Sequence, residues 1–527
     1  RGKLLAPAPG TPYLSDMQKG RVGIVGAGLG GLAAALRLAA SGWEVSVFEK
    51  QEGPGGKAFS EKLGGYRFDT GPSLLTLAAV FEELFSATGA RLSDYLKIER
   101  LETICHYFYP DGTRLRSYGD LERFAAELQE KTGEPREHVL DYFAYSKRIH
   151  DITAELFLRR SLHDPATYWS KRFFSSLFQL GRIDPMKTMD EAHRRFFDSP
   201  KVRQLFNRYA TYNGSSPYKT PATLTIIPYV EYGLGAYAVM EGMYAIPRAM
   251  EKRARELGVE FRYGSAVKRI RTAEVQSGAG GRVTGLETAE GVHAFDVVIS
   301  DADVKPTYRR LLQDPEAPLL KRYERLEPSS SGMVFYWGIK REFPELGLHN
   351  IFFSSEYEKE FSEIFEEGRS PTDPTVYINI TSKVTPGDAP EGGENWFLLI
   401  NVPPDRGQDW EAEAVRVRKR LLRRLSQELG TDVETLIEVE GRLLPPDIEA
   451  RTDSHGGSLY GISSNTRRAA FLRHPNRSPR YKGLYHCGGS AHPGGGMPLV
   501  VLSAMISADL IERHEGKRPL LKADTVS

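Results

Sequence analysis

The chain has 527 residues, of which 40% are hydrophobic, 26% charged and 10% aromatic. This is ordinary globular usage, so a disordered or fibrous protein is excluded. The 70 basic and 69 acidic residues give a net charge of +1. A global electrostatic field that would attract nucleic acid is therefore excluded as well. A chain of this length is expected to fold into several domain-sized units.

Cysteine content and hydropathy predict where the protein works. The two cysteines, Cys105 and Cys487, lie far apart in the sequence. No disulfide framework is expected. The expected location is a reducing compartment, the cytoplasm. No apolar run reaches the roughly 18 residues that a membrane-spanning helix needs. Residues 1–20 contain several prolines and glycines without periodicity, which predicts a disordered extension.

The first predicted unit is a βαβ motif over residues 21–50. The segment RVGIVGAGLGGLAAALRLAASGWEVSVFEK reads as an apolar strand, a glycine turn, an alanine-leucine helix and a second strand. In the pattern GxGxxG, Gly26 makes the tight turn, Gly28 lets a pyrophosphate approach the backbone, and Gly31 allows close helix packing. Glu49 ends the second strand, where a carboxylate can bind an adenosine ribose. The motif predicts dinucleotide binding.

A second glycine turn follows at once. Gly55 and Gly56 precede Lys57, a cation that can reach the pyrophosphate. A nicotinamide-binding domain usually continues straight into another helix, so this turn favours FAD over NAD. Lys50, next to Glu49, is a further candidate cofactor-binding residue.

The next segment carries a family resemblance. EKQEGPGGKAFSEKLGGYRFDTGPSLL resembles the start of the flavin amine oxidase and carotenoid desaturase superfamily. The resemblance implies that Gly71, Pro72 and Ser73 lie near the isoalloxazine ring, the alternative being an ordinary Gly-Pro turn. It also implies an α/β fold, with a Rossmann-like FAD-binding domain, an α+β substrate domain and a helical, membrane-facing insertion.

The middle of the chain is predicted to build the substrate domain. Residues 104–118 predict a strand-turn-strand unit, and residues 119–210 are mostly helical in pattern. Within them, residues 169–178 predict an amphipathic helix that lies in a membrane interface or on the core. Residues 206–231, rich in aromatics and proline, predict a substrate-lining segment or ordinary packing. Glu231 in this segment is the candidate acceptor of the substrate proton.

The chain then returns to the nucleotide domain. The resemblance implies that Val267 contacts the adenine through its backbone and that residues 296–303 form the next nucleotide-domain strand. Residues 331–343 and 394–404 predict further strands of the substrate domain. A basic helix follows at residues 411–429. An apolar stripe that is expected to face the core runs along this helix: Val415, Leu421, Leu422, Leu425 and Leu429. The basic side chains are therefore predicted to form the solvated face of the helix rather than a nucleic-acid surface.

Residues 484–511, LYHCGGSAHPGGGMPLVVLSAMISADLI, predict a strand, a glycine loop and a helix entered through a proline. The amides of the helix start suit the flavin N1/O2 region. The loop resembles that of bacterial phytoene desaturase-type carotenoid desaturases. The resemblance implies that His492 orients the flavin, lines the pocket or stabilises the turn. It also implies that four residues contact the cofactor: Gly489, Gly496, Met497 and Pro498. His486, Cys487 and His492 lack the fourth, ordered ligand of a structural metal site, so no metal is expected.

The function implied by the resemblance is FAD-dependent desaturation of a carotenoid, with hydride passing to the flavin. GGSAHPGGGMPLVVLSA and YATYNGSSPYKTPATL are closer to desaturases of later carotenoids, including 1-hydroxycarotenoid 3,4-desaturases, and to their oxygenase relatives. Oxygen or a quinone is the expected electron acceptor, and peripheral contact with the inner face of the cell membrane is expected. The alternatives are a carotenoid oxygenase or ketolase, a flavin amine oxidase or protoporphyrinogen oxidase, and a prenyl-protein escort without flavin.

The expected domain order is discontinuous. The FAD-binding domain is assigned residues 21–103, 241–310 and 471–515. The substrate domain is assigned residues 104–240 and 311–470. Residues 516–527 are expected to form a tail.

Overall fold

The computed structural model describes residues 19–168, 183–184, 186–274, 280–471 and 473–516. Most of the predicted extension and tail, and the whole predicted amphipathic helix at residues 169–178, lie outside these ranges. These three expectations, and the domain boundaries, stay predictions.

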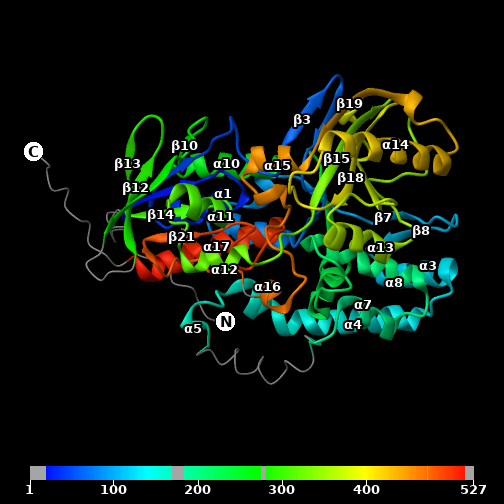
Figure 1. Cartoon of the computed structure of the whole chain (residues 1–527), viewed down its shortest axis with the longest axis horizontal. Helices are drawn as coiled ribbons and strands as arrows, with labels where there is room; N and C mark the ends of the chain where they lie inside the picture. Colours follow the sequence, from blue (N-terminus) through cyan, green and yellow to red (C-terminus); the bar gives the residue numbers. More distant parts are fainter. Residues whose placement is uncertain (1–18, 169–182, 185, 275–279, 472, 517–527) are drawn as a thin grey trace, which may run out of the picture.

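A five-stranded parallel sheet carries the amino-terminal motif (Figure 1). β1 (Arg21–Val25) lies between β2 (Glu44–Phe48) and β14 (Val297–Ser300), while β10 (Glu260–Arg262) and β21 (Leu484–His486) form its edges. Its inner strands are almost continuous apolar runs, as expected for a parallel sheet that is covered on both faces. Three distant parts of the chain thus complete one nucleotide-binding sheet.

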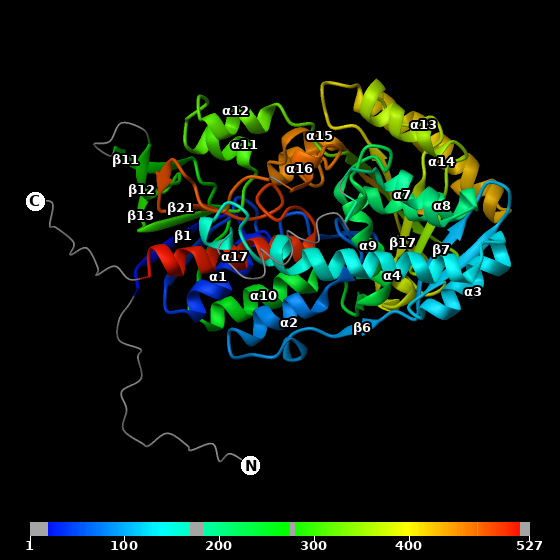
Figure 2. The same cartoon turned by 90° about the horizontal axis from the view of Figure 1, so that it is seen from below.

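Different elements cover the two faces of this sheet. On one face, α1 (Leu29–Ala40) packs against α10 (Ala245–Glu256) and α17 (Met497–His514), as Figure 2 shows. α1 is buried on nearly all sides, which explains its alanine- and glycine-rich composition. On the other face lies a small sheet that includes β11 (Arg269–Glu274) and β12 (Gly281–Glu287).

A seven-stranded mixed sheet forms the second half of the molecule (Figure 1). In β15 (Ser331–Ile339), alternate residues enter two different clusters: Phe335 and Trp337 pack with α14 (Trp410–Leu429), and Tyr336 packs on the opposite face. Across the sheet the strands lie in the order β19 (Ile437–Leu443), β15, β18 (Glu394–Val402), β17 (Val376–Ile380), β16 (His349–Phe352), β7 (Thr103–Phe108) and β8 (Arg114–Tyr118).

The helical insertion lies beside this sheet (Figures 1 and 2). It contains α3 (Leu121–Thr132), α4 (Arg136–Thr153), α7 (Met189–Phe196) and α8 (Pro200–Asn207). The α/β class and the hairpin over residues 104–118 are confirmed, and so is the helical pattern after it in the residues that the structure describes. No described helix is both long and apolar enough to cross a bilayer.

The predicted apolar stripe of α14 is wrong at one position. Val415 is 65% exposed, whereas Leu421, Leu422 and Leu425 are buried and Ala414 and Val417 complete the core face. The helical period places Val415 on the outer side, among the basic residues. Several of those residues bind the protein itself: Arg418 pairs with Glu434 and Glu440, Arg420 donates to the carbonyl of Pro371, and Arg424 donates to the carbonyls of Phe353 and Pro374.

Candidate functional site

A cavity of about 530 Å³ is lined by both halves of the molecule. Most of the predicted site residues line it, although the sequence places them in separate segments. Gly31 and His492 are the two that do not. The predicted residues in the lining are Gly26, Gly28, Glu49, Lys50, Gly56, Lys57, Gly71, Pro72, Ser73, Glu231, Val267, Gly489, Gly496, Met497 and Pro498.

The geometry of the first glycine turn fits a dinucleotide. Gly26 has a φ of +97°, and a Cβ on Gly31 would lie 2.1 Å from the carbonyl oxygen of Gly26. Neither position tolerates an ordinary side chain. The turn therefore brings its backbone to the cavity wall at the start of α1, where amide groups and the helix dipole favour phosphate.

The Glu49 carboxylate is held in place by the backbone. Its Oε2 accepts a hydrogen bond from the amide of Ala27 at 2.8 Å, and its Oε1 accepts one from the amide of Gln51 at 2.9 Å. Each carboxylate oxygen has a further lone pair. An oriented acceptor at this end of β2 suits a ribose hydroxyl.

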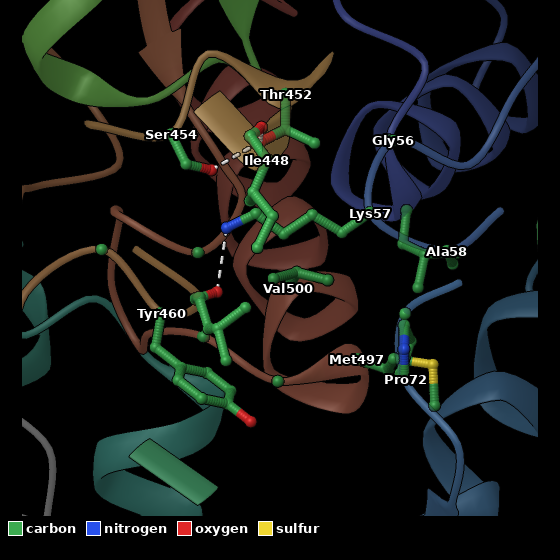
Figure 3. Close-up of a pocket in the computed structure, with 18 of the residues that line it drawn as sticks. Gly56, Lys57, Ala58, Pro72, Ile448, Thr452, Ser454, Tyr460, Met497 and Val500 are labelled. Carbon is green, nitrogen blue, oxygen red and sulfur yellow. Dashed lines mark hydrogen bonds between the residues drawn. The ribbon is translucent and has the colours of Figure 1, made fainter. Parts of the chain in front are cut away.

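The two predicted lysines have partners within the protein. The ammonium of Lys57 donates to the carbonyl oxygens of Ser458 and Leu459, both at 2.9 Å. Figure 3 shows one of these bonds as a dashed line from Lys57. Lys50 pairs with Asp453 at 3.1 Å. In this structure, Lys57 therefore joins the second glycine turn to the loop before Tyr460. Its predicted contact with a pyrophosphate stays a prediction.

Asp301 lies under the phosphate-binding turn. A Cβ on Gly28 would be 2.5 Å from its Oδ2, and Cβ atoms on Gly30 and Gly488 would be 2.3 and 2.5 Å from its Oδ1. The enclosing protein raises the pKa of the Asp301 carboxyl to about 7, and the nearby Glu49 also acts to raise it. The amide of Gly31, Cys487 and Lys57 act in the opposite direction.

This raised pKa predicts a pH-dependent stability. Between about pH 4 and pH 7 the native carboxyl holds a proton that the unfolded chain has released, so native stability falls as pH rises through this window. Asp301→Asn removes the ionisation. We expect the variant to gain about 1–2 kcal/mol over the unsubstituted protein between pH 5 and pH 8, less than the full shift implies because the cavity admits water.

Thermal unfolding of the flavin-free protein across this pH range measures the difference. Asp296→Asn is the matched control, because Asp296 follows β13 (Val292–Ala294) on the surface and lies outside the cavity. A stability difference between Asp301→Asn and the unsubstituted protein that does not change with pH would contradict the assignment.

The second predicted contact region combines a turn and a helix start. The turn Gly71-Pro72-Ser73 and the first turn of α17, with Gly496, Met497 and Pro498, line the same cavity. The proline lies in the first turn of the helix, as predicted. Ser73 Oγ is 2.6 Å from the hydroxyl of Tyr377 on β17. This pair links the nucleotide half to the seven-stranded sheet.

Polar side chains surround Glu231 at the far side of the cavity. Its two carboxylate oxygens accept hydrogen bonds from the hydroxyls of Tyr209 and Tyr212, and the Arg208 guanidinium lies 4.0 Å from Oε1. Glu231 is 1% exposed and Arg208 is 8% exposed. The carboxylate is thus part of a buried ion and tyrosine network that borders the cavity.

His492 has a structural contact outside the cavity. Its Nε2 is 2.8 Å from the carbonyl oxygen of Arg160, so this nitrogen carries the hydrogen and donates it. Burial lowers the pKa of His492 to about 4. The geometry favours the turn-stabilising role among the three that the sequence left open.

Sequence analysis missed several polar residues of the cavity. Asp301 directly follows β14, and the carboxyl end of a parallel strand is a position where ligands bind, so that position could have identified it. Arg208, His349 and Tyr377 come from three different segments and belong to no motif. No local pattern distinguishes them from ordinary core polar residues.

Comparison with known proteins agrees with this geometry. A family model described as flavin containing amine oxidoreductase matches residues 29–511. A 1-hydroxycarotenoid 3,4-desaturase of Flavobacterium sp. (strain P99-3) is 48% identical over 93% of this chain and 98% of its own. A zeta-carotene-forming phytoene desaturase of Myxococcus xanthus is 36% identical over 93% of this chain and 94% of its own. A 4,4'-diapolycopene oxygenase of Methylomonas sp is also 36% identical, over 93% and 98%.

Solved structures share the fold at low sequence identity. An oxidoreductase from Methanosarcina mazei has a TM-score of 0.61 at 16% identity, over 93% of this chain and all of its own. A putrescine oxidase variant has a TM-score of 0.61 at 14% identity, over 94% and 99%. The predicted Rossmann-like architecture and superfamily are confirmed. The chain belongs to the flavin containing amine oxidoreductase family, as an oxidoreductase of its bacterial carotenoid desaturase group.

Proposed function

We propose that this chain uses FAD to desaturate a 1-hydroxycarotenoid at its 3,4 bond. The observation that carries the proposal is the 48% identity, along nearly the whole of both chains, to a protein named for that reaction. The GxGxxG turn, the oriented Glu49 and the cavity between them support a dinucleotide form of flavin.

The chain's own residues suit an elongated apolar substrate. Ile104, Val334, Ile351, Phe397 and Leu399 line the cavity beyond the Gly71-Pro72-Ser73 turn. They would hold a polyene by apolar contact and exclude water from the bond that reacts. When bound, the flavin would supply the hydride acceptor. Glu231 is our candidate for the group that takes the proton.

The proposal includes a membrane and a second redox partner. A carotenoid dissolves in lipid, so the protein would meet its substrate at a bilayer surface, without inserting into it as a spanning protein. The reduced cofactor would pass its electrons to oxygen or a quinone. The aromatic and basic pattern of the sequence at residues 169–178 supports the membrane part of this proposal.

Anaerobic incubation with liposomes tests the reaction. The FAD-loaded protein is mixed with vesicles that carry phytoene, lycopene or a 1-hydroxycarotenoid. We expect the flavin absorption to bleach with the 1-hydroxycarotenoid, and the pigment to lose two hydrogens and gain one conjugated double bond. No bleaching with any of the three would contradict a desaturase.

The oxygenase relatives define the competing outcome. Labelled oxygen is supplied to a parallel aerobic reaction. A product that gains labelled oxygen, without an added double bond, would assign the chain to the oxygenase reaction named for its 36% identical relative. A desaturated product without label supports the proposal.

A further inference from the structure

His349 is a polar residue in the wall of a cavity suited to an apolar substrate. It lies on β16 and is 3% exposed. Its Nδ1 is 3.2 Å from Nδ2 of Asn379 and 2.7 Å from the hydroxyl of Tyr377. The same Nδ2 donates to the carbonyl of Leu348 at 2.9 Å, which fixes the orientation of the Asn379 amide.

These contacts determine the tautomer of His349. An amide NH₂ group can only donate, so Nδ1 accepts and carries no hydrogen. Burial lowers the pKa of His349 to about 3, so the ring is neutral and its hydrogen is on Nε2. This N–H finds no hydrogen-bond partner within the described ranges of the chain. Buried donors are almost always satisfied, so an unused one in a cavity wall calls for a ligand oxygen.

A chain of hydrogen bonds connects His349 to the Gly71-Pro72-Ser73 turn, which is predicted to contact the flavin. Because Nδ1 accepts, the Tyr377 hydroxyl donates to it, and the same hydroxyl oxygen can accept from Ser73 Oγ at 2.6 Å. These bonds fix the His349 ring, and with it the donor on Nε2, relative to Ser73. Two further cavity-lining side chains nearby, Arg208 and Tyr357, also have buried polar atoms without a partner in the described residues.

We infer that His349 is a specificity-determining residue that donates a hydrogen bond from Nε2 to the hydroxyl oxygen of the substrate. The inference rests on the proposed function and deepens it. In a 1-hydroxycarotenoid the hydroxyl-bearing carbon and the nearer reacting carbon are separated by a single carbon. The oxygen must therefore lie beside the reacting bond, close to the turn to which His349 is linked. A hydrocarbon of the same length leaves the donor unpaired and is disfavoured.

Paired substrates and three variants test this role. The unsubstituted protein, His349→Gln, His349→Leu and His349→Phe are assayed anaerobically with a 1-hydroxycarotenoid and with the same carotenoid lacking the hydroxyl. We expect the unsubstituted protein to prefer the hydroxylated substrate in kcat/KM by about tenfold or more. Glutamine keeps an N–H donor and should retain most of this preference. Leucine and phenylalanine should reduce it to about twofold or less, through the hydroxylated substrate alone.

Flavin content and thermal stability show whether each variant is folded. If leucine disrupts the fold, phenylalanine provides the donor-free ring. His106→Leu on the neighbouring strand β7 is the matched control, because His106 is not a cavity-lining residue, and it should keep the preference. A folded His349→Leu or His349→Phe that keeps the preference overturns the inference, as does an unsubstituted protein that uses both substrates equally. If the unsubstituted protein converts neither, the proposed function fails first.

Discussion

Gly71→Ala is expected to weaken flavin binding by up to about 100-fold and to lower turnover with it. A Cβ at this position would lie 1.9 Å from the carbonyl oxygen of Lys57 and 3.0 Å from its carbonyl carbon. Both are backbone atoms, so the second glycine turn or the Gly71-Pro72-Ser73 turn must move, and both line the cavity. Strain of about 1–3 kcal/mol placed on the bound conformation weakens binding by up to about 100-fold. Flavin absorbance per purified chain and a titration with FAD measure the loss.

A second glycine provides the control for this substitution. At Gly387, a Cβ would meet no atom within 4 Å and the φ is not left-handed, so Gly387→Ala should bind flavin normally. A Gly71→Ala protein with a full flavin complement would show that the turn can move without loss. In that case, flavin binding would not depend on the close approach of the two turns.

Glu231→Gln is expected to lower stability and turnover together. The substitution leaves the buried Arg208 guanidinium without its carboxylate and presents an amide to hydroxyls that now donate to Glu231. Removal of one partner from a buried ion pair costs about 3–5 kcal/mol. Chemical denaturation measures this part. Stability alone does not separate a structural role from proton transfer.

The double variant Glu231→Gln, Arg208→Met separates the two roles. Removing the unpaired cation should recover much of the stability. If Glu231 takes the proton, turnover should stay at least about 100-fold below that of the unsubstituted protein. If turnover returns with stability, the proton-acceptor assignment is wrong. Glu363→Gln, which breaks a different buried carboxylate network outside the cavity, should change stability but not turnover.

Local sequence patterns predicted the nucleotide-binding half well. Gly26, Gly28, Gly31 and Glu49 belong to one short motif whose spacing follows from the βαβ unit itself. The requirement for a residue without a Cβ at Gly31 is set by a turn only a few residues away. The proline-led start of α17 is equally local. Such features depend on backbone geometry within a segment, which the order of residue types is sufficient to specify.

Long-range contacts decided what these local patterns could not. The local pattern gave no partner for Lys57 within the protein, and its ammonium donates to carbonyls some 400 positions later in the chain. Its contact with a pyrophosphate stays a prediction. Val415 belonged to an apolar stripe by residue type, yet the angular position of α14 exposes it. His492 stood in the most specific motif and still turned away from the cavity to bind the carbonyl of Arg160.

The sequence by itself therefore determined the superfamily, the α/β class and the residues of the dinucleotide turn. Only the tertiary structure showed that Arg208, His349 and Tyr377 line the same cavity as the predicted Ser73 and Glu231. Glu231, His349 and Tyr377 come from the insertion, β16 and β17, and Ser73 comes from the nucleotide half. Their pairing depends on how the two halves pack, and packing is a sum of many weak contacts that no single segment encodes.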